Sequence, residues 1–395
     1  MDTLVHLSKG NTSTFSILQQ HRFNVNLILG VLSNAVVTID KRNGRLEAVL
    51  GLADQRGYRE GIGTDALFNY IDGLLQIHGS WIISDLFNSC LRRAAANALE
   101  TTTYGGVCES AEGDIGFRAG SLLKARFHHP GSMVADPFHA DRFFLIETFD
   151  GIVQVDMRYQ NATMFYRHNF ESYGHHIMID PLNQDLLFDN DCTIQRLSEK
   201  GTLETLSVAI FPSWWDKEQF CTETKLRGFS FITSNTVLAA DSTSNRLLSF
   251  TTLNKQENPY KQICKTLSFY HGVRLDGPKE RCRLTTPMSV LVLPDYVYIG
   301  EREGVRRLTY TIKNDSRPVA DNSSDITTVQ PNTTTELTTF HHLSSTTANI
   351  STKPTFPITR EDAENVTLGG ENTTYLLPMV NSQISILYEY QGETR

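Results

Sequence analysis

The chain has 395 residues, of which 40% are hydrophobic and 10% aromatic, enough to bury a sizeable core. Its 36 basic and 44 acidic side chains give a formal charge of −8, which argues against a role that depends on neutralising many phosphates. We therefore expect no nucleic-acid partner. The sequence contains neither G-x-S-x-G nor H-E-x-x-H, and we expect no cofactor.

The N-terminal region divides at residue 22. Residues 1–22 carry no clear strand or helix pattern, and we expect them to be unstructured. Residues 23–37 (FNVNLILGVLSNAVV) have two interpretations, the apolar core of a secretory signal or strands of a first blade. We favour strands, because Asn24 and Asn26 weaken a signal peptide and a hairpin begins within this segment.

Two repeated patterns follow along the chain. Residues 57–68 (GYREGIGTDALF) and 116–127 (GFRAGSLLKARF) share one register of Gly, aromatic, Arg, Gly, Ala and Phe. A second pattern, strand, acid, polar turn and strand, predicts a hairpin and occurs six times, at intervals typical of propellers. The copies occupy 35–49, 81–93, 143–155, 185–197, 237–250 and 297–310, with acids Asp40, Asp85, Glu147, Asp189, Asp241 and Glu301.

These two patterns together resemble the NHL-repeat β-propeller family, and the closest match is ADSTSNRL at 240–247. The resemblance covers about residues 23–312 and implies an all-β fold with six blades. A blade buries its faces only against its neighbours, so we expect Phe68 and Phe127 to pack between blades. The glycines of the repeated stretch would supply turns in the connections. We expect the acids to hold their turns by hydrogen bonds, which makes them poor catalytic candidates.

The composition changes after residue 312. Residues 313–374 are rich in Ser and Thr, which predicts a disordered stalk, and residues 375–395 have no assigned structure. The final apolar run at 375–388 is too short and interrupted to span a bilayer, so membrane association would need an anchor missing from this chain. Sequons for N-glycosylation lie at Asn11, Asn161, Asn314, Asn322, Asn332, Asn349, Asn365 and Asn372.

Six cysteines lie in the propeller region, with no zinc-ligand spacing. They favour disulfides in an oxidising compartment, although a chain of this length can also bury free thiols. If they pair, we expect sequence neighbours to bond: Cys90 with Cys108, Cys192 with Cys221, and Cys264 with Cys282.

Few residues stand out as functional candidates. Trp214 and Trp215 lie in a long insertion and suit an interface anchor, although a buried pair between blades is an equal alternative. His129, His175 and His271 lie near the starts of expected inner strands, where histidines from several blades could bind a metal. The sequence also permits the simpler reading that these histidines lie on the surface or in loops.

The sequence favours a non-catalytic protein, secreted or on the cell surface, that presents a propeller face to a protein or glycan ligand. Loops on a rigid scaffold are common binding sites, and the sequons, Ser/Thr tract and cysteines together point outside the cell. The family resemblance implies an alternative, a metal-dependent lyase or lactone hydrolase with a histidine-lined central channel.

Overall fold

The structure is a computed structural model, and it describes most of the chain before residue 313. The described residues are 2–7, 14–108, 116–170, 175–190, 193–206, 224–252, 261–263, 282, 284–302, 304–312 and 386–387. Within these ranges the regular structure is strand, apart from two 3-10 helices, η1 (Gly63–Asp65) and η2 (Leu86–Asn88). The predicted all-β class is therefore confirmed.

Apart from one two-stranded pair at the C-terminal end, the described strands form six antiparallel sheets, which are the blades of a propeller. The first blade holds β2 (Phe15–Gln20), β3 (Leu27–Leu32), β4 (Ala35–Asp40) and β5 (Leu46–Leu50). The second holds β7 (Ile71–Ile77), β8 (Ser80–Asp85), β9 (Cys90–Ala95), β10 (Glu100–Gly106) and β6 (Gly61–Ile62). The third holds β12 (Pro130–Ala135), β13 (Arg142–Glu147), β14 (Gly151–Asp156), β15 (Asn161–Arg167) and β11 (Gly120–Ser121).

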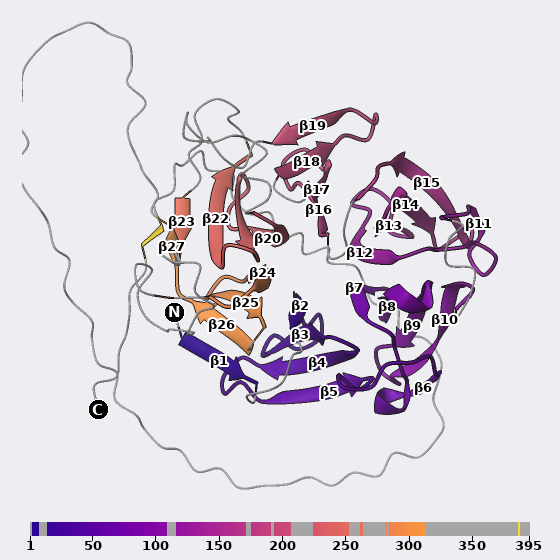
Figure 1. Cartoon of the computed structure of the whole chain (residues 1–395), viewed down its shortest axis with the longest axis horizontal. Coiled ribbons are helices and arrows are strands. Elements are labelled where there is room, and N and C mark those ends of the chain that lie inside the picture. The colour runs from indigo at the N-terminus through magenta and orange to yellow at the C-terminus, as the bar shows by residue number, and fades with distance from the viewer. Residues whose placement is uncertain are drawn as a thin grey trace, which may run out of the picture. The chain divides into compact units, whose positions relative to one another are not determined.

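The remaining three blades have four strands each. The fourth holds β16 (Ile177–Ile179), β17 (Leu186–Asn190), β18 (Thr193–Leu197) and β19 (Leu203–Leu206). The fifth holds β20 (Leu226–Phe231), β21 (Thr236–Asp241), β22 (Arg246–Thr251) and β23 (Lys261–Ile263). The sixth holds β24 (Pro287–Val292), β25 (Val297–Glu301), β26 (Gly304–Leu308) and β1 (Asp2–His6). Figure 1 shows the blades around a ring with β2, β7, β12, β16, β20 and β24 innermost, which confirms the six-bladed propeller.

The N-terminal strand closes the ring. β1 pairs with β26, with Asp2 opposite Arg307 and His6 opposite Gly304, so the last blade takes its outermost strand from the start of the chain. β2 then opens the first blade. Residues 1–22 are therefore not unstructured as expected, because two of these strands lie within them. Closing the ring in this way pairs a sheet edge that would otherwise stay open.

The core is divided among the junctions between blades. The described residues form six apolar clusters, and each joins two neighbouring blades. Phe68 packs with Leu29 of the first blade and Ile83 of the second, and Phe127 packs between the second and third blades. Both expectations for these rings are confirmed. Because neighbours cover both faces of a blade, its second strand is buried on both sides, and all six residues of β8 are buried.

The two repeated Gly-aromatic stretches run between blades and add a fifth strand to each of two sheets. In the first, β6 pairs with β10, and in the second, β11 pairs with β15 in the matching register. Gly116 has φ 72°, and a Cβ there would lie 3.0 Å from the carboxylate of Asp150. This glycine is required because the backbone is left-handed and the neighbouring carboxylate is close.

The hairpin predicted at 35–49 joins the third and fourth strands of its blade, whereas the other predicted hairpins join the second and third strands. In the second, third, fifth and sixth blades the acid ends the second strand and pairs with the first residue of the innermost strand, as Ile71 pairs with Asp85. The first blade has Leu32 at that place, opposite Phe15. Asp40 instead ends the third strand and binds the neighbouring Arg42 at 2.7 Å. Its assignment to the acid series was wrong, because Asp also suits the turn between third and fourth strands.

At the C-terminal end β27 (Thr311–Ile312) pairs with β28 (Ile386–Leu387). The expected stalk at 313–374 lies outside the described residues, as does most of 375–395. In the part of the chain that the structure describes, no helix has the length and apolar character to cross a membrane.

Candidate binding face

The acids at the ends of the second strands fix one face of the propeller. Asp85, Glu147, Asp189, Asp241 and Glu301 are all fully buried. Each accepts a backbone N–H from the segment that leads into the innermost strand of its own blade; the donors are Asn69, His128 and His129, His176, Lys225, and Thr285, respectively. The acids are therefore structural clamps that hold the connecting loops. We call the face on which these strands end the acid face.

In four of these five blades a basic side chain lies against the acid. Asp85 pairs with Arg92 at 3.3 Å, Asp241 with Arg246 at 2.7 Å, and Glu301 with Arg306 at 3.5 Å. In the fourth blade His175 takes the place of the arginine, and its Nδ1 lies 2.6 Å from Asp189. A buried carboxylate is stable only when paired or hydrogen-bonded, so these contacts offset the loss of water.

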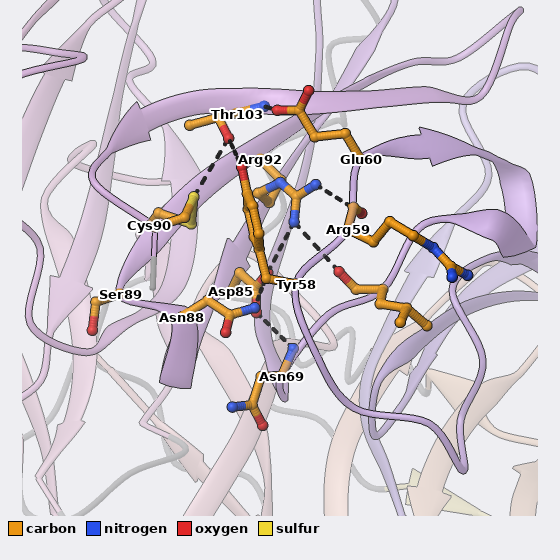
Figure 2. Close-up of a disulfide and its surroundings, with 12 residues drawn as sticks. Tyr58, Arg59, Glu60, Asn69, Asp85, Asn88, Ser89, Cys90, Arg92 and Thr103 are labelled. Carbon is orange, nitrogen blue, oxygen red and sulfur yellow. Dashed lines mark hydrogen bonds and ion pairs between the residues drawn. A yellow bond between two sulfur atoms is a disulfide. The ribbon is translucent and has the colours of Figure 1, made fainter. Parts of the chain in front are cut away.

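Figure 2 shows how the repeated Gly-aromatic stretch encloses the arginine of the second blade. The guanidinium of Arg92 lies 4.6 Å from the ring centroid of Tyr58 and 5.4 Å from that of Phe68. It donates to the carbonyl oxygens of Arg59 (3.1 Å) and Leu67 (3.4 Å). The rings and carbonyls stabilise the guanidinium away from water through its two terminal nitrogens, while its Nε has no hydrogen-bond partner among the described residues.

The carboxyl of Asp85 is held from several sides. Asn88 donates to its Oδ2 at 2.9 Å and the backbone N–H of Asn69 donates to its Oδ1 at 2.8 Å (Figure 2). Burial raises the pKa of Asp85 to about 6, while these hydrogen bonds and Arg92 act in the opposite direction. These contacts give the carboxyl of Asp85 a structural role.

The third blade lacks the cation. Val153 faces Leu145 in the pairing of β13 with β14, where Arg92 faces Ile83 in the second blade. Oε1 of Glu147 accepts from two backbone N–H groups, and Oε2 has no hydrogen-bond partner among the described residues. Burial raises the pKa of Glu147 to about 8, with a smaller contribution from Asp150. Burial therefore favours the protonated form of Glu147.

Five ring side chains gather on the acid face where the second and third blades meet. We call Tyr70, Phe87, His128, His129 and Phe149 the aromatic patch. The ring of His129 lies 6.0 Å from that of Phe87 and 5.9 Å from that of Phe149, and both ring planes are at 83° to its own. Phe87 is 47% exposed and Phe149 38% exposed. Large apolar rings open to solvent on rigid loops are typical of interaction sites.

Two residues of the aromatic patch have unusual backbone conformations. Tyr70 has φ 68° and Phe149 has φ 73°, a region that bulky residues rarely adopt. The backbone N–H of Tyr70 donates to Asn34 Oδ1 at 2.8 Å, and that of Asp150 donates to the carbonyl of Glu147 at 3.0 Å. Such conformations cost about 1–3 kcal/mol each and cluster at functional sites. Eight other described non-glycine residues also have positive φ, and Thr286 repeats the Tyr70 arrangement by donating to Asn245 Oδ1. What distinguishes Phe149 is that this backbone carries an exposed ring.

Charged groups of both signs lie near the patch among the described residues. Asp150 accepts from the backbone N–H of Phe117 at 3.0 Å and lies 3.9 Å from His128 Nδ1. Burial lowers the pKa of His129 to about 4, and His128 contributes in the same direction, so the His129 ring is neutral at pH 7. At the other end, burial raises the pKa of Tyr70 to about 12; Asp72 adds to the rise and Arg227 opposes it.

The structure places only some of the residues singled out from sequence. His129 lies in the aromatic patch, whereas His175 is buried against Asp189. Trp214, Trp215 and His271 lie outside the described residues. Within the described part of the chain no group of three potential ligands could hold a metal ion, and the metal-dependent enzyme stays a prediction.

Sequence reasoning missed Phe87 and Phe149, although a signal was present. Each follows its blade acid by two residues, in DLF at 85–87 and ETF at 147–149. The turn after the second strand carries these rings onto the acid face. The aromatic residue after the acid was therefore the sequence signal for the aromatic patch.

The predicted disulfide between Cys90 and Cys108 is confirmed. Cys282 is also disulfide-bonded, while Cys192, Cys221 and Cys264 lie outside the described residues. Of the sequons, Asn161 begins β15, and the others lie outside the described residues.

No family model and no curated protein matches the chain. Among solved structures, an auxiliary nutrient binding protein from Bacteroides thetaiotaomicron is similar at TM-score 0.52 and 13% identity, over 77% of this chain and 75% of that one. The similarity shows the propeller fold alone. Virginiamycin B lyase from Staphylococcus aureus (TM-score 0.45, 12% identity, 77% and 84% covered) and a chain of the nidogen/laminin complex (0.45, 12%, 69% and 84%) are also similar.

Proposed function

We propose that this chain is an extracellular binding protein that contacts a protein ligand through the acid face, with the aromatic patch as the centre of the contact. The observation that carries the proposal is the pair of exposed rings, Phe87 and Phe149, held on clamped and strained loops. Aromatic residues dominate the energetics of protein interfaces, and rigid loops reduce the entropy lost on binding.

The extracellular setting is supported by the cysteines. The Cys90–Cys108 bond and the bonded Cys282 suit an oxidising compartment, because cytosolic thiols are kept reduced. Intact mass of protein from its native source, before and after N-glycosidase and thiol alkylation, tests this setting. Glycan on Asn161 or the C-terminal sequons with no free thiol is expected. A bare chain that alkylates at all six cysteines would contradict it.

The binding role is tested by screening the purified protein, presented as a multivalent probe, against panels of secreted and cell-surface proteins and an array of glycans. A Phe87→Ala/Phe149→Ala variant is compared with a control, Phe23→Ala/Phe138→Ala. The control rings are exposed in the connections β2–β3 and β12–β13, at the opposite ends of the blades. We expect a small set of protein hits that the patch variant loses and the control keeps.

Two outcomes would overturn this proposal. If all hits survive the patch variant, the aromatic patch is not the binding site. If the hits lost by the patch variant are glycans and not proteins, the ligand class is wrong and the site is right.

A further inference from the structure

Two neighbouring turns at one end of the first blade expose apolar and cationic side chains together. We call residues 21–26 (HRFNVN) and 40–45 (DKRNGR) the tip turns. They lie side by side because β3 pairs with β4, and the backbone N–H of Lys41 donates to the carbonyl of Asn26 at 2.9 Å. One turn precedes the second strand of the blade and the other follows the third, so both lie at the end opposite to the acid face.

The first tip turn carries two apolar side chains into solvent. Phe23 is 64% exposed and Val25 is 66% exposed, and they alternate with two asparagines. The turn is held in shape because Nδ1 of His21 accepts from the backbone N–H groups of Phe23 and Asn24, each at 3.1 Å. The described residues add no other exposed large apolar side chain to these turns, so the apolar area is confined to the tip.

The charges of the tip turns are mainly positive, although the whole chain has a formal charge of −8. The turns contain one carboxylate, Asp40, and four cationic side chains, which are Arg22, Lys41, Arg42 and Arg45. Arg42 lies 2.7 Å from Asp40 and Arg45 lies 3.7 Å from Glu47, and both arginines are largely exposed. Exposed pairs of this kind are weak, so they leave the cations able to attract another anion.

The second tip turn is fixed against the last blade. Gly44 has φ 72°, and a Cβ there would overlap the carbonyl oxygen of Leu4 in β1. The backbone N–H of Gly44 donates to the carbonyl of Asp40 at 2.8 Å, and that of Arg42 donates to Oδ1 of Asp40 at 2.9 Å. The backbone that carries the cations is therefore already ordered before any ligand binds.

We propose that the tip turns bind the surface of a membrane that exposes anionic lipids. Phe23 and Val25 enter the headgroup region, and the cationic side chains lie at the lipid phosphates. Apolar side chains of surface-bound elements reach about 5–10 Å into the boundary between headgroups and acyl chains, and neighbouring Lys and Arg are attracted to anionic lipid. A protein partner would require a broader apolar centre with few charges, which these turns lack.

This binding goes beyond the proposed function and is compatible with it. It needs no transmembrane segment, unlike the membrane association considered from the sequence. Because the tip turns lie at the end of the blade opposite to the acid face, a protein bound to a membrane in this way keeps the aromatic patch open to its ligand.

The test uses the full chain and two kinds of sucrose-loaded vesicle, one of phosphatidylcholine alone and one that also contains phosphatidylglycerol at about 30%. Co-sedimentation is measured at pH 7 and about 150 mM salt, where distant charges are screened. We expect binding to the anionic vesicles to be at least about tenfold tighter. Phe23→Ser/Val25→Ser and Arg22→Gln/Lys41→Gln should each weaken that binding by about tenfold.

Val107→Ser/Arg167→Gln is the matched control, because it removes one exposed apolar and one exposed cationic side chain from the other end of the propeller. Val107 is 45% exposed and follows β10, and Arg167 ends β15; both of these strands end on the acid face. The control should bind the anionic vesicles within about twofold of the wild type. Circular dichroism and the unfolding midpoint check that each variant is folded.

Equal binding to the two kinds of vesicle would overturn the inference. So would unchanged binding by Phe23→Ser/Val25→Ser, because cations that act without the apolar tip indicate a soluble polyanion such as a sulfated glycan. Loss of a protein hit in Phe23→Ser/Val25→Ser, with vesicle binding unchanged, would assign the tip turns to a protein partner instead. The proposed function fails separately, because Phe87→Ala/Phe149→Ala leaves the tip turns intact and its screen contains no membrane.

Discussion

The second and third blades each bury an acid at the end of their second strand, but different side chains surround the acid in the two blades. Both begin with the repeated Gly-aromatic stretch, and both end their second strand with a buried acid that accepts backbone N–H groups. In the second blade Arg92 lies between Tyr58 and Phe68. In the third blade the equivalent rings, Phe117 and Phe127, lie 5.8 Å apart and contact one another.

The comparison shows what the acid is for. Glu147 keeps its backbone hydrogen bonds although Val153 has replaced the cation, so the clamp on the connecting loop is the common requirement and the ion pair is a variable addition. In the third blade burial favours the protonated carboxyl, whereas in the second blade a cation lies beside the carboxyl. Removing or restoring charge in each blade tests this difference.

The largest effect is expected for Arg92→Met. The change leaves Asp85 buried with its hydrogen bonds from Asn69 and Asn88 and without its cation, and breaking a buried pair in this way costs about 3–5 kcal/mol. Urea unfolding with the disulfide intact measures the loss. Arg93→Met, on the exposed next residue, is the control and should cost less than about 1 kcal/mol. A loss below about 1 kcal/mol for Arg92→Met would mean that the pair is dispensable.

The same variant has a second readout. Asp85→Asn in the Arg92→Met background removes the uncompensated charge and should recover part of the lost stability. If the double variant is as unstable as the sum of the single ones, the two side chains do not act as a pair.

The next effect concerns the Cys90–Cys108 bond, which joins residues 18 apart in the second blade. Cys90→Ala/Cys108→Ala should lower the free energy of unfolding by about 3 kcal/mol, because the bond restricts the unfolded chain. Equilibrium denaturation of the purified variant measures this. An unfolding midpoint equal to that of the wild type would show that the bond adds no stability. Non-reducing peptide mapping of the wild-type protein confirms that the bond is formed.

Most of this fold could be predicted from the sequence because each hairpin carries a recognisable pattern within a few consecutive residues. A run of β-branched and aromatic residues, an acid and a polar turn are enough to find the second and third strands of five blades. The first blade was misread because Leu32 replaces the acid and Asp40 imitates it one strand later. The strand at Asp2–His6 could not be read from DTLVH, since it forms only by pairing with β26 at the far end of the propeller.

The candidate site was harder to predict than the fold. Its rings come from the loops before β7 and β12 and from the turns after β8 and β13, and only His129 among them attracted notice in the sequence. Their proximity follows from the register of two neighbouring blades, which spacing along the chain does not reveal. The absence of a cation beside Glu147 was equally hidden, because it depends on which residue of β14 faces which residue of β13.

A smaller effect that depends on pH is expected for Glu147→Gln. The pKa of Glu147 is about 8 in the folded protein, above the ordinary value of 4.5. The folded state therefore binds the proton more tightly, and the stability that this proton supplies is complete at pH below about 4.5 and is lost as pH rises through 8. Glutamine stays neutral, so the variant should gain on the wild type as pH rises, by at most about 1.4 kcal/mol per pH unit.

Urea unfolding at pH 5, 6.5 and 8 measures the difference between wild type and variant. Glu100→Gln, at an exposed position at the start of β10, is the control and should show a difference that does not change with pH. A constant difference for Glu147→Gln as well would mean that Glu147 ionises normally in the folded protein, and the contrast between the two blades would then lie in packing alone.

The smallest effect on stability is expected for Phe149→Asn, and it separates stability from binding. Phe149 has φ 73° and is 38% exposed, so we expect relief of its strained backbone to offset the loss of the buried part of its ring. Asparagine tolerates this conformation, and the variant should be as stable as the wild type or up to about 1 kcal/mol more stable. The same change should weaken binding of a protein ligand found with the wild-type chain by about tenfold, because an exposed ring of the aromatic patch is removed. A variant that loses stability would show instead that the ring of Phe149 is retained for packing. The strained backbone of Phe149 would then be no evidence that this turn is a binding loop.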